Sequence, residues 1–243
     1  MCPAHGLARL IISGRFGTPP RVQPNITDSK CPHFVGICEA VWMTSGAVGF
    51  DLDMTLIDSL PQILESFHAL AEETDIEIDL DVIEARLGIK LEDELAHWFA
   101  PHDVAGAAAT YRHHYARLAA LGTVVLPGAH DAMAAVRASG RAVAIITAKH
   151  QSSVEPCLVA TGISPDTLHA FVHGREKAEV LRNIAAAMYV GDTPDDMTAA
   201  RDAGVVAIGV ATGAFTATDL LQAGASTALH SLSAFPDAYA SFL

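Results

Sequence analysis

The sequence predicts an α/β fold, a Rossmann-like, doubly wound parallel sheet with helices on both faces. After Pro127-Gly128, short apolar segments alternate with helical segments. Continuous apolar runs are typical of parallel strands that are covered on both faces. The predicted strands are residues 141–147, 170–173, 187–191 and 205–210, and the helices between them begin near Ala129, Ser152, Lys177 and Pro194.

A long helical block separates these strands from an earlier one. The earlier strand is the apolar run that begins at Val48. It is followed by residues 59–123, which carry apolar side chains at helical spacing, such as Leu64, Phe67 and Ala71. We therefore expect residues 46–58 and 124–243 to form the core domain. Residues 59–123 are expected to form a helical domain inserted after the first strand.

The N-terminal segment differs in composition from the rest of the chain. Prolines interrupt residues 1–45, and no strand or helix period persists there. A segment of this kind is predicted to be disordered. Met43 lies five residues before the first strand and would be a natural start for the domain, so residues 1–42 are interpreted as a loose extension.

Charge and composition narrow the class of partner. The formal net charge is −13, and 51% of the residues are hydrophobic. We expect neither nucleic acid nor an anionic membrane surface as a partner, since both bind basic patches. No stretch reaches the roughly 18 consecutive apolar residues of a membrane helix. Four cysteines in a chain without a secretory signal predict a reducing, cytoplasmic location, and the oligomeric state stays open.

Two carboxylates, Asp51 and Asp53, follow the first predicted strand directly. Side chains alternate along an extended chain, so these two point the same way from its carboxyl end. Crowding like charges is unfavourable unless a cation or a proton lies between them. Such a pair suits a nucleophile beside a general acid and base, with a divalent metal neutralising the cluster. Solvated aspartates at a turn are the structural alternative.

Polar side chains also stand at the ends of other predicted strands. Thr147-Ala148-Lys149 ends the strand 141–147, and Asp192 and Asp196 follow the strand 187–191. Lys177 begins the helix between those strands. Ligands of open α/β sheets bind beyond the carboxyl ends of the strands, so we expect these groups to meet at one edge.

Taken together, these motifs resemble those of the haloacid dehalogenase-like phosphohydrolase superfamily. The resemblance rests on D-x-D-x-T at 51–55, an apolar strand ending in Thr147, Lys177 at a helix start, and G-D-x-x-x-D at 191–196. It extends from residue 46 to about residue 236. Four motifs in this order are a specific signal.

The resemblance implies a role for each residue. Asp51 would attack the phosphorus of a small phosphomonoester to form an aspartyl-phosphate. Asp53 would protonate the leaving alkoxide and then deprotonate the attacking water. Thr147, Ala148 and Lys177 would bind the phosphoryl group, with Lys177 also holding Asp51.

The resemblance also implies Mg²⁺ as cofactor. Its expected ligands are the Asp51 carboxylate, the backbone carbonyl of Asp53, and Asp192. Asp196 would act directly or through water, whereas Asp195 lies one residue off the motif. Thr55 is expected to support the loop rather than to react.

The helical block resembles the C1 cap of this family, in the subgroup that contains phosphoglycolate phosphatases and sugar phosphate mutases. A cap closes over the site and selects the leaving group. Arg86 and Lys90 are the candidates for contacting an anionic leaving group. Surface charges on a loop are the alternative reading of both.

The sequence departs from the patterns of other activities in the superfamily. Dehalogenases and phosphonatases depart at the position of Asp53. Mutases of the sugar phosphate type carry a histidine near the start of the first cap helix, where this chain has Pro61-Gln62-Ile63-Leu64. Phosphatase is therefore favoured. Mutase remains the first alternative, and a catalytically silent phosphometabolite-binding member the second.

Overall fold

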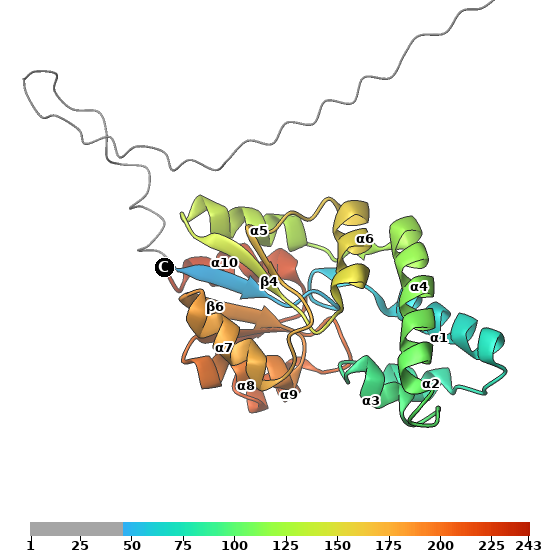
Figure 1. Cartoon of the computed structure of the whole chain (residues 1–243). Helices are drawn as coiled ribbons and strands as arrows, with labels where there is room; N and C mark the ends of the chain where they lie inside the picture. Colours follow the sequence, from blue (N-terminus) through green and yellow to red (C-terminus); the bar gives the residue numbers. More distant parts are fainter. Residues whose placement is uncertain (1–45) are drawn as a thin grey trace, which may run out of the picture. The chain divides into compact units, whose positions relative to one another are not determined.

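Six parallel strands form one sheet, in the order β5-β4-β1-β6-β7-β8. The computed structural model describes residues 46–243, so the predicted disorder of residues 1–45 lies outside the described residues (Figure 1). The strands of the sheet are β1 (Ala47–Phe50), β4 (Ala142–Ile146), β5 (Thr167–His169), β6 (Ala186–Gly191), β7 (Val206–Val210) and β8 (Thr227–Leu229).

Helices cover both faces of the sheet, which confirms the predicted α/β class. Helices α5 and α10 lie on one side of β1 and β4, and α7 and α8 lie on the other (Figure 1). Leu181, Met197 and Leu220 from α7, α8 and α9 form the core on one face, and Met133 and Phe235 belong to the core on the other. The helices are α5 (Ala129–Ala138), α6 (Gln151–Thr161), α7 (Arg175–Asn183), α8 (Pro194–Ala203), α9 (Ala217–Gln222), η1 (Leu232–Ala234) and α10 (Phe235–Ala240).

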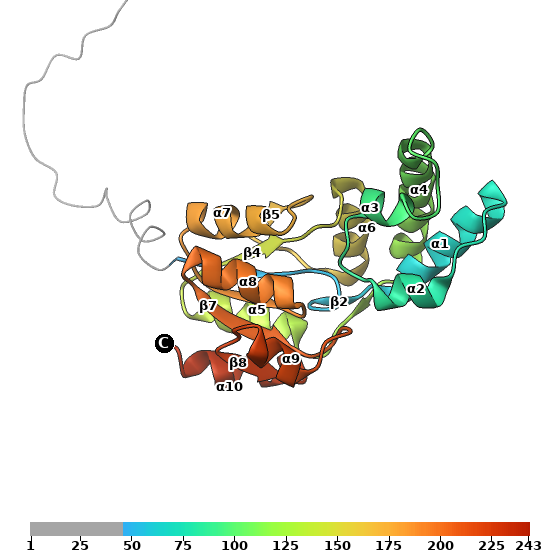
Figure 2. The same cartoon turned by 90° about the horizontal axis from the view of Figure 1, so that it is seen from below.

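Four further helices lie between two short strands. These helices are α1 (Leu60–Thr74), α2 (Leu80–Ala85), α3 (Leu91–Leu95) and α4 (Val104–Gly122). Strand β2 (Ile57–Asp58) pairs antiparallel with β3 (Val124–Val125), so the chain enters and leaves the helical segment through adjacent strands. Figure 2 shows β2 between the sheet and α2. We call α1–α4 the insertion, and we propose that it forms the inserted domain predicted from the sequence.

The insertion contacts the core through its longest helix. Helix α4 packs against α1 within the insertion and against α6 of the core. No helix in residues 46–243 has the length and apolar character that crossing a membrane requires.

The strand predicted at 170–173 begins three residues too late. Strand β5 comprises Thr167–His169, which pairs in parallel with β4. Phe171 cannot continue the strand because its φ is 60°, in the left-handed region. The backbone N–H groups of Phe171 and Val172 instead donate to the carbonyls of Lys149 and Thr147, at 2.9 and 3.0 Å. This loop therefore lies against the end of β4, beside the predicted site.

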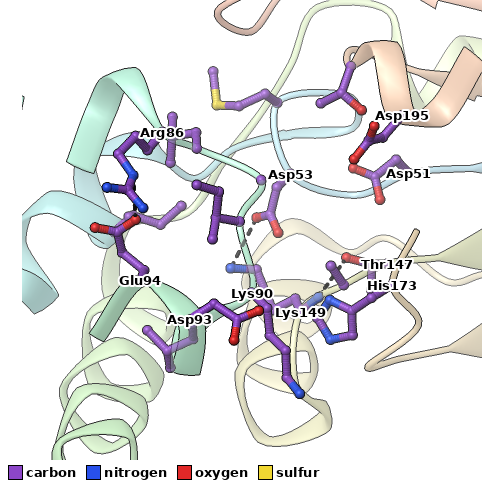
Figure 3. A pocket seen from close by; sticks show the side chains of 18 of the residues that line it. Asp51, Asp53, Arg86, Lys90, Asp93, Glu94, Thr147, Lys149, His173 and Asp195 are labelled. Carbon is purple, nitrogen blue, oxygen red and sulfur yellow. Dashed lines mark hydrogen bonds and ion pairs between the residues drawn. The ribbon is translucent and has the colours of Figure 1, made fainter. Parts of the chain in front are cut away.

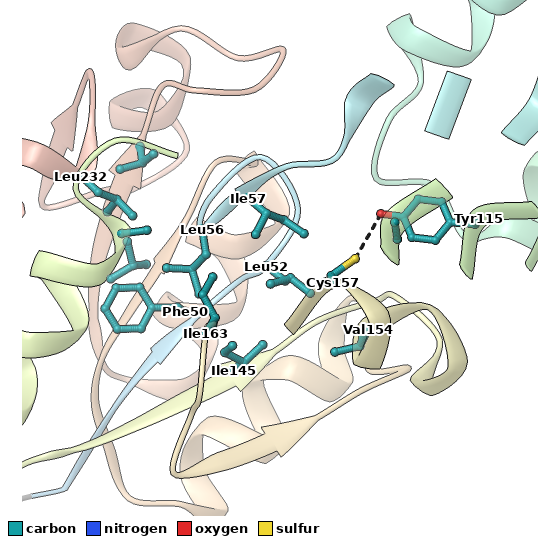
Figure 4. Close-up of a cluster of buried hydrophobic side chains, with 14 of the residues drawn as sticks. Phe50, Leu52, Leu56, Ile57, Tyr115, Ile145, Val154, Cys157, Ile163 and Leu232 are labelled. Carbon is teal, nitrogen blue, oxygen red and sulfur yellow. Dashed lines mark hydrogen bonds between the residues drawn. The ribbon is translucent and has the colours of Figure 1, made fainter. Parts of the chain in front are cut away.

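The apolar residues after β1 anchor the loop that carries the two aspartates. Leu52, Leu56 and Ile57 have no exposed surface and pack in the same core as Phe50 (Figure 4). The carbonyl of Leu52 accepts hydrogen bonds from the N–H groups of Leu56 and Ile57, at 2.9 and 3.1 Å. The loop is thus fixed both by burial and by its own backbone.

We expect Phe235→Ala to destabilise the core. The Phe235 side chain is fully buried, with its ring centroid 5.5 Å from that of Phe50 and 5.3 Å from that of Tyr239. The free energy of unfolding should fall by about 3–5 kcal/mol, because the truncation leaves a cavity. Urea denaturation followed by circular dichroism measures it. Phe242→Ala is the control: Phe242 is 39% exposed, and its replacement should change stability by no more than about 0.5 kcal/mol.

Candidate active site

The predicted site residues meet at the carboxyl edge of the sheet. Asp51 and Asp53 follow β1, Thr147 follows β4, and Asp192 follows β6. Lys177 lies in the first turn of α7 and reaches the same place. Figure 3 shows Asp51, Asp53 and Thr147 around one pocket. The sheet order explains this convergence, because β1 lies directly between β4 and β6.

Lys177 connects two of the carboxylates. Its Nζ lies 3.1 Å from Asp51 Oδ1 and 2.7 Å from Asp196 Oδ1, and the residue is only 7% exposed. Burial by itself would lower the pKa of Lys177. The carboxylates of Asp196 and Asp51 outweigh burial and hold that pKa well above its usual value. Lys177 is therefore a permanent cation beside Asp51.

Asp192 is held by the loop that carries the first motif. The hydroxyl of Thr55 donates to Asp192 Oδ1 at 3.0 Å, which places Thr55 where a supporting residue is expected. The Asp192 carboxylate also lies against Gly213, where an added Cβ would be 2.1 Å from Oδ2. Burial raises the pKa of Asp192 well above its usual value, and the nearby Asp196 and Asp51 raise it further.

The three acids form a cluster that suits a metal ion. One carboxylate oxygen each of Asp51, Asp192 and Asp196 lies within 4.8 Å of the others, and all three residues are buried. Burial raises the pKa of Asp51 to about 7, although the Lys177 ammonium acts in the opposite direction. Three carboxylates against one ammonium leave two negative charges uncompensated when all are ionised. A hard divalent cation with oxygen ligands fits both the charge and the donor atoms.

Asp196 differs from the other two acids because both of its oxygens are already occupied. Oδ1 accepts from Lys177, and Oδ2 accepts from the N–H and the hydroxyl of Thr193, at 3.2 and 2.7 Å. Metal ligation by Asp196 stays a prediction, and these contacts favour a role in holding Lys177. Asp195 is exposed and lines the pocket, with no ion pair among the described residues.

Thr147 lines the pocket, and its hydroxyl donates no hydrogen bond to another of the described residues. Its Oγ1 accepts a hydrogen bond from the backbone N–H of Lys149 at 3.2 Å, and the residue is 1% exposed. A hydroxyl that accepts on its oxygen can still donate its proton. Thr147 can therefore donate to an anion in the pocket, next to the backbone of Ala148, which also lines it.

The pocket is a cavity of about 580 Å³ between the core edge and the insertion. Apolar side chains of the insertion form much of one wall, including Phe67, Ile83 and Tyr111. A volume of this order accommodates a small metabolite.

Arg86 and Lys90 both line the pocket, and their side chains contact different groups. Arg86 Nε lies 3.0 Å from Oε2 of the buried Glu94, so this guanidinium is already neutralised. Lys90 Nζ lies 5.5 Å from the centroid of the Phe171 ring. The insertion thus contacts the loop after β5 across the pocket.

The sequence motifs assign no role to Lys149 or to Glu94. Lys149 Nζ lies 3.0 Å from Asp53 Oδ1 and 3.9 Å from the centroid of the Tyr115 ring. The signal for Lys149 was present, since the residue stands at a strand end two positions after Thr147. Its partner ring comes from α4, however, and no local pattern relates Lys149 to Tyr115.

Comparisons with known proteins identify the family of this chain. The sequence matches the family described as haloacid dehalogenase-like hydrolase over residues 48–210. The plasmid phosphoglycolate phosphatase of Cupriavidus necator is 29% identical in a 180-residue alignment, which covers 65% of this chain and 78% of that protein. The probable phosphatase IndB of Dickeya dadantii is 28% identical in a 224-residue alignment, which covers 78% of this chain and 97% of that protein.

A solved structure shows the same fold. A haloacid dehalogenase-like family hydrolase from Streptococcus pneumoniae is similar with a TM-score of 0.68 and 23% identity, over 82% of this chain and 98% of that one. The chain belongs to the haloacid dehalogenase-like hydrolase family, which confirms the resemblance seen in its motifs. The predicted enzyme class, a phosphatase, agrees with the names of both curated relatives.

We expect the metal-free protein to lose stability as the pH rises. The pKa of the Asp51 carboxyl is raised from 3.8 to about 7 by folding, so the folded protein keeps a proton that the unfolded chain has lost in this interval. Stability then falls between about pH 4 and about pH 7. Thermal unfolding in EDTA should show a decreasing Tm over this range, and Asp51→Asn should reduce the slope.

Two controls separate this effect from a general loss of charge. Asp195→Asn removes an exposed carboxylate near the cluster and should keep the wild-type slope. Added MgCl₂ should raise the Tm more at about pH 8 than at about pH 5, because the cation competes with protons for the same oxygens. Equal slopes in the wild type and Asp51→Asn would contradict the prediction.

Proposed function

We propose that this protein is a Mg²⁺-dependent phosphatase that hydrolyses a small phosphomonoester through an aspartyl-phosphate at Asp51. The observation that carries the proposal is the position of the Asp51 carboxylate. It lies beside a buried ammonium and clusters with two further acids suited to a metal, and Asp51 lines the same pocket as Thr147. The family supports a hydrolase, and the curated relatives named as phosphatases support a phosphate ester as the substrate.

In the first chemical step Asp51 is the nucleophile. Lys177 contacts Oδ1, whereas Oδ2 accepts no hydrogen bond from the described residues and is free to attack. An Asp51 oxygen forms a bond to phosphorus as the ester P–O bond breaks. Asp53 donates a proton to the departing alkoxide, which leaves as an alcohol.

In the second step Asp53 acts as a base. It takes a proton from water as that water attacks the phosphorus of the aspartyl-phosphate. The bond between Asp51 and phosphorus breaks, so inorganic phosphate leaves and the Asp51 carboxylate is restored. The proton that Asp53 gave to the alcohol is thereby replaced from water.

The transferred phosphoryl group would be held by groups on the core edge. Thr147 donates its hydroxyl hydrogen, the backbone at Ala148 lies beside it, and Lys177 offsets negative charge. Asp51, the Asp53 carbonyl and Asp192 would ligate Mg²⁺, with Asp196 acting through Lys177 or through water. The bound cation supplies positive charge that neutralises the acids and the phosphoryl oxygens.

The insertion would act as the cap that selects the leaving group. Its wall of the pocket is mostly apolar, with Arg86 already paired to Glu94. Lys90 has no ion pair among the described residues, so of these two cations it is the one available to bind an anionic leaving group. A phosphoglycolate-like or sugar phosphate substrate remains the proposed class, by analogy with the relatives.

No observation favours the mutase alternative. His68 is 51% exposed in its side chain, lies 3.9 Å from Glu72, and is absent from the residues that line the pocket. A catalytically silent binding protein would have no use for Asp53. In this protein the Asp53 carboxylate faces the same pocket as Asp51, which favours an enzyme over a silent binding protein (Figure 3).

We expect the purified protein to release p-nitrophenol from p-nitrophenyl phosphate only when Mg²⁺ is present. Asp51→Asn should lower kcat by at least about 10³-fold, because an amide oxygen is a far weaker nucleophile than a carboxylate. The assay is the absorbance of p-nitrophenolate after metal removal and replacement.

The control for folding is Asp131→Asn, which alters an exposed acid on α5 outside the pocket. It should keep the wild-type rate. Wild-type activity in Asp51→Asn would reject Asp51 as the nucleophile, and no turnover by folded, Mg²⁺-loaded wild type would reject the phosphatase.

A further inference from the structure

Lys149 is a buried cation to which the mechanism above gives no role. Its side chain is 8% exposed, and its Nζ lies 3.0 Å from Asp53 Oδ1. Within residues 46–243, no other cation lies within ion-pair distance of Asp53. Asp53 Oδ1 also accepts no hydrogen bond of good geometry there. The orientation of this carboxylate therefore depends on one ammonium group.

The insertion holds that ammonium in place. Lys149 Nζ lies 3.9 Å from the centroid of the Tyr115 ring, close enough for a strong cation–π contact. Tyr115 belongs to α4 and is fully buried, and its hydroxyl lies 3.5 Å from the Sγ of Cys157 on α6 (Figure 4). The ring is thus fixed between the insertion and the core.

The backbone of Lys149 is fixed as well. Its N–H donates to Thr147 Oγ1 at 3.2 Å, and its carbonyl accepts from the N–H of Phe171 at 2.9 Å. Burial alone would lower the pKa of Lys149, but the Asp53 carboxylate outweighs burial and raises it. Both ends of this side chain are therefore constrained, and its head remains charged.

We propose that Lys149 is a positioning residue that orients the Asp53 carboxylate toward the leaving group, and that Tyr115 holds Lys149 for this purpose. The inference rests on the function proposed above. The phosphoryl site lies at Asp51, Thr147 and Lys177 on the core edge, so the rest of the ester extends toward the insertion. A general acid acts only within hydrogen-bond reach of the atom that it protonates, and the ion pair restricts Asp53 to that side.

The experiment compares two esters of nearly equal shape, phenyl phosphate and p-nitrophenyl phosphate. Phenolate is a strong base and needs a proton as it leaves, whereas p-nitrophenolate leaves readily without one. The ratio kcat/KM reports steps up to the first irreversible one, here departure of the phenol. It therefore separates general-acid catalysis from later hydrolysis of the aspartyl-phosphate.

Lys149→Met should lower kcat/KM for phenyl phosphate by about 10-fold to 100-fold, and for p-nitrophenyl phosphate by less than about threefold. Asp53→Asn should show the same selectivity with a larger loss. Lys149→Arg keeps a cation and should restore part of the loss for phenyl phosphate.

A matched pair of variants tests the contribution of the insertion. Tyr115→Phe keeps the ring and should keep the wild-type ratio between the two esters, whereas Tyr115→Leu removes the ring and should change the ratio in the direction of Lys149→Met. This pair also keeps the inference testable if Lys149→Met does not fold, which its Tm would reveal.

Failure of the proposed phosphatase activity can be distinguished from failure of the positioning role of Lys149. A wild type that cleaves neither ester rejects the phosphatase, and the role of Lys149 with it. A wild type that cleaves both, with folded Lys149→Met or Tyr115→Leu losing the two activities equally, rejects the positioning role alone.

Discussion

The ammonium of Lys177 among three buried carboxylates is the interaction around which the core edge is arranged. Unpaired charges are expensive to bury, so Asp51, Asp192 and Asp196 require compensating charge. Lys177 reaches Asp51 from one side and Asp196 from the other. The end of β1 and the first turns of α7 and α8 are thereby held together.

Close backbone packing makes this arrangement possible. An added Cβ at Gly191 would lie 2.5 Å from the Cβ of Asp196, and one at Gly213 would lie 2.1 Å from Asp192 Oδ2. Two glycines thus leave space for two acids. One of these acids, Asp196, also forms a capping box with Thr193 at the start of α8. The residual negative charge that this packing creates is what a divalent cation would neutralise.

The sequence predicted this part of the protein well for a physical reason. Parallel strands place their carboxyl ends at one edge, so Asp51, Thr147 and Asp192 had to converge once the strands were recognised. The position of β5 was missed because the left-handed φ of Phe171 has no signature in an apolar run. The pairing of Arg86 with Glu94 was also hidden, since it depends on how the turn between α2 and α3 folds back.

The least predictable feature links the insertion to the chemistry. β2 begins at Ile57, a few residues after Asp53, so the segment that carries the second acid is also the segment by which the chain enters the insertion. The insertion then returns to the same acid from the other side, through Tyr115 on α4 and the ammonium of Lys149. Asp53 is therefore connected to the insertion twice, covalently through β2 and electrostatically through Lys149. Any displacement of α4 relative to the sheet must change the second connection, because the cation–π contact between Tyr115 and Lys149 weakens with distance. Asp51 shows no such dependence within residues 46–243, since its backbone N–H donates to Val190 of β6 and its carboxylate accepts from Lys177 of α7.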